Sequence, residues 1–371
     1  MRRLEYIDGL RALAALWVAF HHAIETSEPQ WAMSLPVFGP ILTSLFFGQF
    51  PVMIFLMLSG FCLYYPYVRK NPEAPEFTTG YGPYLVRRAT RIAPPYLWAG
   101  VFCLAMAAVP ALQVGRWKIV GPVDASVIAS HLLFVHNLIP SHAGKIDYPM
   151  WSIGLEWQLY LLFPLLIWAF RRTKPVVVAG ICLVIAAIIR GTYRHIPLPT
   201  SAILHDGPFS YLEIFAVGMI AASLTVRGKT VAPKWVLGCV AVAGFAAVRF
   251  GSGNGLVHDL ATTAAAFSIL LLAADHDTAV SRVLSTPWLV RIGVFSYSLY
   301  LVHAPLVHLF WLALTPLHLS PDATFGVLAI ACMPLIVVIS YGFHVLFERP
   351  FMRVKAEPAP ARREQVQEAP P

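Results

Sequence analysis

Runs of apolar residues long enough to cross a lipid bilayer recur along the whole 371-residue chain. Hydrophobic residues make up 58% of the chain and charged residues 12%, about half the charged share of an ordinary soluble domain. Because the bilayer core offers no water to an exposed backbone, such runs must form helices. The sequence therefore predicts an all-α, multi-pass protein of the plasma (inner) membrane.

We expect ten transmembrane helices with both termini cytoplasmic. Cytoplasmic loops carry an excess of Lys and Arg, and this assignment puts 21 of the 27 on the inner side. The net charge of +8 thus follows from topology and does not indicate nucleic-acid binding. The predicted spans are residues 8–26, 41–67, 92–110, 151–170, 175–193, 209–226, 233–250, 257–274, 288–314 and 324–347.

The chain is predicted to contain one membrane domain, residues 1–350, followed by a disordered cytoplasmic tail, residues 351–371, rich in Pro, Glu and Arg. Residues 111–150 form an outward segment. Its apolar piece "DASVIASHLLFVHNLIP" is short and bounded by prolines, which favours an interfacial or re-entrant helix. The five scattered cysteines show no metal-ligand spacing, so no bound metal is expected.

Ionisable residues inside transmembrane spans are costly and usually functional. In "LRALAALWVAFHH" (residues 10–22), Arg11 and His22 are eleven residues apart, which puts them on one helix face about three turns from each other. His21 lies about 100° off that face. The alternative is that Arg11 snorkels or pairs with Asp8 while His22 contacts headgroups.

Three arginines, Arg87, Arg88 and Arg91, gather in "YLVRRATRIAPPYLW", at the inner end of a span that we expect to open at the two prolines. Arg88 and Arg91 are one turn apart, a spacing that suits bidentate binding of a phosphate. Ordinary anchoring by positive charge at the inner membrane surface is the alternative.

A polar stripe is predicted in "MWSIGLEWQLYLLFP" (residues 150–164), because Ser152, Glu156 and Tyr160 recur every four residues. Glu156 could orient an imidazole, hold a sugar hydroxyl, or pair with an arginine of another helix.

A second shared face is predicted in "FSYSLYLVHAPL" (residues 295–306), formed by Ser296, Tyr300 and His303. His303 either lines a cavity or hydrogen-bonds a carbonyl freed by Pro305.

These segments, in this order, resemble the acyltransferase 3 family of integral-membrane acyltransferases. The resemblance rests on the segments quoted above together with "FLMLSGF" and "FERP", and it covers residues 1–350. It implies transfer of an acyl group, usually acetyl, from cytoplasmic acyl-CoA to a hydroxyl of a carbohydrate or glycolipid at the outer face. An exopolysaccharide or other envelope glycan is the expected acceptor class, and the oligomeric state stays open.

The resemblance also implies roles for individual residues. His22 would be the catalytic base, with Glu156 orienting it or binding the acceptor. Direct transfer and an acyl-histidine intermediate both remain open. The phosphates of acetyl-CoA, the donor co-substrate, would be bound by Arg11, Arg87, Arg88 and Arg91. The substrate-binding candidates are Ser152, Tyr160, His303 and Trp151.

A transporter or flippase for a glycolipid or oligosaccharide is the main alternative, since it also needs buried charges and about ten spans. It would move its substrate without consuming acyl-CoA. A membrane glycosyltransferase is less compatible with the sequence, because no large acidic loop is present.

Overall fold

The structure, a computed structural model, describes residues 4–36, 38–112, 123–192, 206–250 and 255–352, and all regular structure within them is helical. The first helices are α1 (Glu5–Ser27), α2 (Gln30–Ser34), α3 (Phe38–Leu45), α4 (Gln49–Lys70), α5 (Tyr81–Ala107), α6 (Ala125–Leu132), α7 (Pro140–Ala143) and α8 (Trp151–Arg172). They are followed by α9 (Pro175–Thr192), α11 (Leu212–Arg227), α12 (Lys234–Phe250), α13 (Gly255–Ala274), α14 (Ala279–Leu284), α15 (Pro287–Val294), α16 (Ser296–Leu314), α17 (Pro321–Val327), α18 (Met333–Phe343) and α19 (Arg349–Met352).

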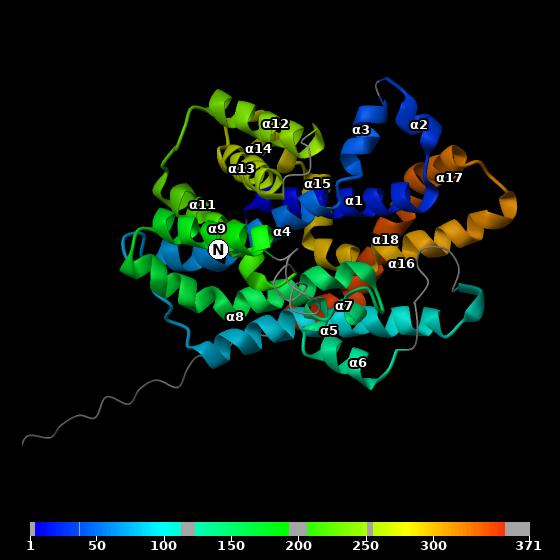
Figure 1. The fold of residues 1–371 in the computed structure, drawn as a ribbon, viewed down its shortest axis with the longest axis horizontal. Coiled ribbons are helices and arrows are strands. Elements are labelled where there is room, and N and C mark those ends of the chain that lie inside the picture. The colour runs from blue at the N-terminus through cyan, green and yellow to red at the C-terminus, as the bar shows by residue number, and fades with distance from the viewer. Residues whose placement is uncertain (1–3, 37, 113–122, 193–205, 251–254, 353–371) are drawn as a thin grey trace, which may run out of the picture.

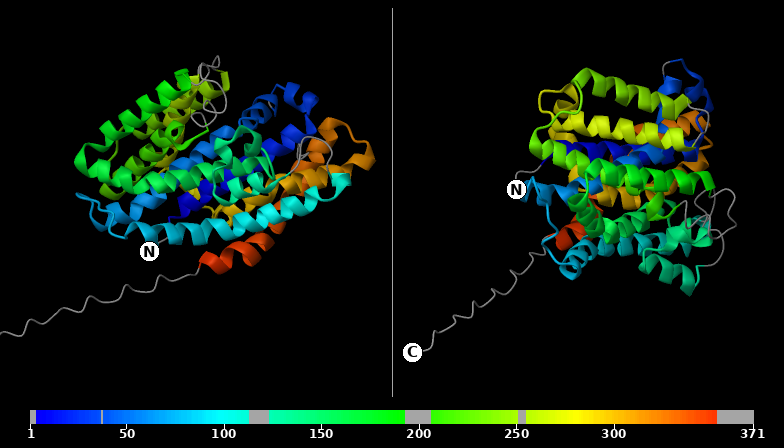
Figure 2. Two further views of the ribbon diagram at one scale, coloured as in Figure 1. Left: turned by 60° about the horizontal axis from the view of Figure 1, so that its bottom comes forward. Right: turned by 60° about the vertical axis from the view of Figure 1, so that its left-hand side comes forward.

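The long helices pack side by side in one bundle (Figures 1 and 2). α12 and α13 form an antiparallel pair at one edge, and α2, α3 and α17 gather at another (Figure 1). There the backbone N–H of Ala32 donates to Oδ1 of Asp322 at 2.7 Å, which ties the α2 region to α17.

A helix occupies each of the ten ranges in which a transmembrane span was predicted. Six helical stretches are long and apolar enough to cross a membrane, so the chain is a multi-pass membrane protein. They are Gln49–Lys70, Tyr148–Arg172, Pro175–Thr192, Val257–Ala274, Ser296–Leu317 and Pro321–Met352. The number ten and the cytoplasmic placement of the termini stay predictions.

Three predicted ranges differ from the structure, and one of them, 288–314, is divided at Phe295 between α15 and α16. The range 41–67 is divided between α3 and α4, because the helix is interrupted between Leu45 and Gln49. The range 92–110 does not open at the two prolines: α5 already begins at Tyr81 and runs through both of them. Arg87, Arg88 and Arg91, which precede Pro94, therefore lie within a continuous helix. Packing against neighbouring helices offsets the backbone hydrogen bonds that the two prolines remove.

Among the described residues, the outward segment contains the short helices α6 and α7 and short 3₁₀ turns, and an interfacial or re-entrant placement stays a prediction. Asp124 caps α6 by accepting from the backbone N–H groups of Ser126 and Val127. α6 ends at Leu132, and a positive φ of 57° at Phe134 turns the chain into a 3₁₀ turn, His136–Leu138. The predicted disordered tail lies almost entirely outside the described residues.

Close helix contacts depend on glycines. A Cβ on Gly60 of α4 would lie 2.1 Å from the carbonyl oxygen of Phe215, and one on Gly218 of α11 would lie 2.0 Å from that of Met57. The two backbones therefore touch through glycine from both sides, a packing typical of membrane helices.

The last long helix, Pro321–Met352, contains two π-helical turns, Leu328–Cys332 and His344–Glu348. Each lies just before a proline, Pro334 or Pro350, which has no N–H to donate to the preceding turn. A wider turn adjusts the backbone at such a position. The second π turn carries Glu348, whose side chain lines the cavity of the candidate site.

We predict that Gly218→Ala destabilises the bundle by roughly 1–3 kcal/mol, because the added methyl overpacks the α4–α11 contact. Thermal unfolding of the purified protein in lipid nanodiscs measures the effect. Gly238→Ala on α12 is the matched control, since no atom lies within 4 Å of its Cβ position. Equal melting temperatures for the two variants would contradict the role given to Gly218.

Candidate active site

A cavity of about 220 Å³ lies between α1, α4, α5, α8 and α16. Most of the bundle is apolar, but this cavity is lined by three arginines and two glutamates. They are Arg11, Arg88, Arg91, Glu156 and Glu348. The site therefore combines three of the sequence-predicted arginines with the predicted carboxylate Glu156.

Arg11, Arg88 and Arg91 form no ion pair within 4 Å among the residues that the structure describes. In addition, Nε of Arg88 is buried without a hydrogen-bond partner. A buried guanidinium donor without a partner is costly. The donors converging on this cavity suit an anionic ligand such as a phosphate.

A second cavity of about 280 Å³ shares Cys62, Leu63 and Arg88 with the first. It is lined on its other side by Lys70, the last residue of α4, and by Arg87. Arg87 thus does not line the inner cavity but stands with Lys70 in the adjoining one. Together the two cavities are lined by four arginines, Arg11, Arg87, Arg88 and Arg91, and by Lys70.

The predicted stripe on α8 faces the inner cavity, because Ser152, Glu156 and Tyr160 all line it. Oε1 of Glu156 accepts hydrogen bonds from the Ser59 hydroxyl at 2.7 Å and from the Tyr160 hydroxyl at 2.5 Å. The sequence analysis did not select Ser59, and it missed the bond of Ser59 to Glu156. Nothing in the local sequence signals it.

Glu348 is a further carboxylate at the cavity that the sequence reasoning did not select. Its Oε2 accepts from the Ser298 hydroxyl at 2.5 Å and lies 2.8 Å from Nδ1 of His344. It belongs to "FERP", a segment that contributed to the family resemblance but to no residue role. The π turn that carries it packs against α5, and its side chain lines the cavity together with Arg91.

His22 does not line this cavity. It is 5% exposed, and its Nδ1 lies 3.2 Å from Oε2 of Glu25, one turn along α1. Its ring is 5.2 Å from the ring of His303 on α16. The carboxylate that contacts His22 is thus Glu25, which the sequence reasoning missed although the three-residue spacing is a usable signal.

His303 and Tyr300 stand between His22 and the cavity. Tyr300 lines the cavity, and its hydroxyl lies 2.7 Å from that of Ser152. The rings of Tyr300 and His303 are 5.6 Å apart. Nδ1 of His303 donates to the Tyr300 carbonyl at 2.7 Å. The carbonyl that Pro305 leaves without a helical donor is that of Leu301, so this bond is not the one predicted. Arg11 lines the cavity together with Tyr300, and His22 lies beside His303, so both residues of α1 are near α16.

Trp151 lies outside the cavity, with its ring 6.2 Å from that of Tyr211. Another buried carboxylate, Glu213, has a structural partner: its Oε1 lies 3.3 Å from Nη2 of Arg190, which also pairs with Asp259 at 2.8 Å. This network joins α9, α11 and α13 away from the cavity, so it is a tie between helices.

The outward segment buries its own titratable groups. The rings of His131 and His136 stack at 3.9 Å, and the Tyr96 hydroxyl bonds Nδ1 of His131 at 2.8 Å. Burial lowers the pKa of His131 to about 3 and of His136 to about 4. Asp147 is also buried, with both carboxylate oxygens unpartnered, and burial raises its pKa well above its usual range.

The chain matches the acyltransferase domain family Acyl_transf_3 over residues 4–345. It is similar to the acyltransferase MdmB of Streptomyces mycarofaciens, with 28% identity over 95% of this chain and 92% of the relative. It is also similar to nodulation protein 10 of Rhizobium leguminosarum bv. viciae, with 26% identity over 81% of this chain and 82% of that protein. No solved structure matches the chain significantly.

We predict that Asp147→Asn stabilises the outward segment relative to the wild type, by a margin that grows as pH rises from 5 to 8. The opposite effect of the buried His131 and His136 is common to both proteins and cancels in this comparison. The pKa of Asp147 is raised on folding, so above a pH of about 3.8 the unfolded segment ionises while the folded one resists ionisation. Hydrogen exchange of residues 125–150 at pH 5 and pH 8 measures the effect.

Asp124→Asn is the control for this prediction, because the pKa of exposed Asp124 is lowered by hydrogen bonds from Ser126 and Val127. Asp124 therefore stays ionised over that pH range, and its replacement should leave the pH dependence of exchange unchanged. A stability difference between Asp147→Asn and the wild type that does not grow with pH would contradict the role given to Asp147.

Proposed function

Because the chain belongs to the acyltransferase domain family Acyl_transf_3, we propose that it transfers an acyl group, acetyl in the first instance, from cytoplasmic acyl-CoA to a hydroxyl of an extracytoplasmic carbohydrate or glycolipid. The observation that carries the donor assignment is the set of three arginines that face one cavity without ion pairs among the described residues. The cavity has the charge that a donor carrying phosphates requires.

The two adjoining cavities fit the donor as a pair. The phosphate-bearing end of the donor would meet Lys70 and Arg87 in the second cavity, and Arg88 where the two cavities adjoin. Arg11 and Arg91 line the first cavity, whose volume of about 220 Å³ holds only a slender part of such a donor. The arrangement supports binding of the polar end on the side of Arg87, with the thioester directed along α16.

His22 suits the role of general base. A carboxylate at Nδ1 favours the tautomer with the hydrogen on that nitrogen, so Nε2 carries the lone pair that accepts a proton. The acceptor oxygen would attack the thioester carbonyl as His22 takes its proton. A carbon–oxygen bond forms, the carbon–sulfur bond breaks, and the imidazolium returns the proton to the thiolate.

The two carboxylates would have different tasks. Glu25 contacts His22 and orients its ring. Glu156 accepts hydrogen bonds from Ser59 and Tyr160 and lines the cavity together with Arg11. We therefore assign Glu156 to the donor cavity, where it holds the side chains of Ser59 and Tyr160 in position, and Glu25 to the orientation of the base.

Transfer at His22 requires a path past Tyr300 and His303. Both residues lie on α16, and Tyr300 lines the cavity with its hydroxyl bonded to that of Ser152. The acyl group would pass along this face, either directly to the acceptor or by way of an acyl-histidine. Trp151 and the outward segment lie on the acceptor side in this scheme, with an envelope glycan as the acceptor and the plasma membrane as the location.

We predict that Arg88→Ala weakens acetyl-CoA binding by roughly 10- to 100-fold, the loss of a charge-assisted hydrogen bond worth about 1.5–3 kcal/mol. The protein is purified in lipid nanodiscs, and binding is measured by calorimetry. Arg172→Ala is the control, because Arg172 stacks on Trp168 outside the cavity and should bind the donor as the wild type does.

We predict that His22→Ala retains donor binding and lowers the turnover number about 10²–10⁴-fold, the range that general-base catalysis contributes. Release of free CoA in the presence of a soluble glycan acceptor measures turnover. Wild-type protein that moves a glycolipid without consuming acyl-CoA would instead favour a transporter.

A further inference from the structure

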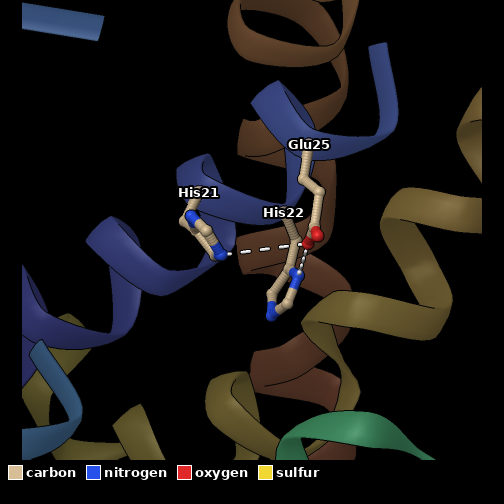
Figure 3. A group of neighbouring side chains, drawn as sticks. All are labelled: His21, His22 and Glu25. Carbon is tan, nitrogen blue, oxygen red and sulfur yellow. Dashed lines mark hydrogen bonds and ion pairs between the residues drawn. The ribbon is translucent and has the colours of Figure 1, made fainter. Parts of the chain in front are cut away.

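His21 has no role in the proposed transfer, yet it lies beside the catalytic end of the site. Its Nε2 is 3.8 Å from Oε2 of Glu25, and Nδ1 of His22 is 3.2 Å from the same oxygen. Figure 3 shows both rings turning a nitrogen atom toward this carboxylate. One carboxylate therefore faces two imidazoles from a single stretch of α1.

The helix itself creates this convergence. Residues three and four apart lie on the same side of a helix, so Glu25 is a neighbour of both His22 and His21. The three potential ligand atoms all lie within 4.8 Å of one another. From these observations we propose that His21, His22 and Glu25 form a binding site for a zinc-like divalent transition-metal ion, and that the bound ion inhibits acyl transfer.

The ligand set favours this class of ion. Two imidazoles and one carboxylate are the protein ligands of many zinc sites that keep a fourth position open for water. Imidazole suits zinc, copper and nickel, whereas magnesium and calcium prefer oxygen ligands.

The geometry is close to a tetrahedral site. Ligand atoms about 2.1 Å from zinc are roughly 3.4 Å apart, so the pair of His22 and Glu25 is already spaced correctly. No two of the three ligand atoms are more than 4.8 Å apart, so the widest gap must close by at most roughly 1.4 Å, which a rotation of the imidazole of His21 can supply.

Two further features favour access and movement. A Cβ on Gly48 would lie 2.4 Å from Cδ2 of His21, so glycine at this position is what leaves room for the ring. The side chains of His21 and Glu25 are 17% and 35% exposed, which gives an ion an approach that His22, at 7%, does not offer by itself.

The inhibition rests on the proposed function, in which Nε2 of His22 accepts the hydroxyl proton. An ion on Nδ1 would take the position of the hydrogen that faces Glu25, so the neutral ring must carry its hydrogen on Nε2. The base is then lost. The same ion would also draw Glu25 away from its orienting contact.

The first arm of the test measures binding and does not depend on activity. Zinc is titrated into the full chain in nanodiscs, with any polyhistidine tag removed. The wild type should bind one zinc per chain, and His21→Ala should bind it at least roughly tenfold more weakly, as loss of even an outer partner of a metal site costs about 10–100-fold. Glu25→Gln should weaken binding likewise.

His258→Ala is the matched control, because His258 lies 3.8 Å from a single carboxylate, Asp259, and should leave zinc affinity unchanged. Magnesium should not compete. Equal zinc affinity in the wild type and in His21→Ala would overturn the site, as would the absence of zinc binding to the wild type.

The second arm measures turnover. His21→Ala should match the wild type without zinc, and should need at least roughly tenfold more zinc for half-inhibition. Chelation should restore the wild type. Zinc binding that leaves wild-type turnover unaffected would overturn the inhibition, whereas a chain without acyl-CoA turnover in any form would overturn the proposed function and leave the binding arm to decide on the site.

Discussion

A charged side chain inside an apolar helix bundle needs either an opposite charge or a polar space, and this constraint separates the arginines of the protein into two groups. Arg190 has opposite charges on both sides, from Glu213 and Asp259, and it ties three helices together. Arg11, Arg88 and Arg91 face a cavity instead. The first kind of arginine supports the fold, and the second is available to a ligand.

The cavity exists because helices meet closely around it. A Cβ on Gly293 would lie 2.0 Å from the carbonyl oxygen of Asp8, and Gly293 itself lines the cavity. The contact between α1 and α15 is therefore made by backbone, and it holds Arg11 one turn further along α1. Packing and site geometry depend on the same absence of a side chain, so the site is built into the core of the bundle.

The donor cavity and His22 are two ends of one structure, joined by α16. Tyr300 borders the cavity and His303 borders His22, and the two rings are in contact. Since both groups belong to one helix face, a movement of that face would act on the cavity and on the base together. His21 and Glu25 add a partly exposed edge at the same end, where an ion can reach the base from outside the donor path.

Hydropathy and periodicity alone determined the helical membrane character, the ten helical ranges, the shared face of Arg11 and His22, and the stripe on α8. These properties depend on residues close together in the chain. The pairing of His22 with Glu25 is equally local, although the sequence analysis missed it. Only the tertiary structure decided that Ser59 meets Glu156, 97 residues away, that Glu348 enters the cavity, and that Tyr300 separates the cavity from His22. The physical reason is that periodicity defines the faces of a helix, whereas the helix that each face contacts is decided by packing of the whole bundle.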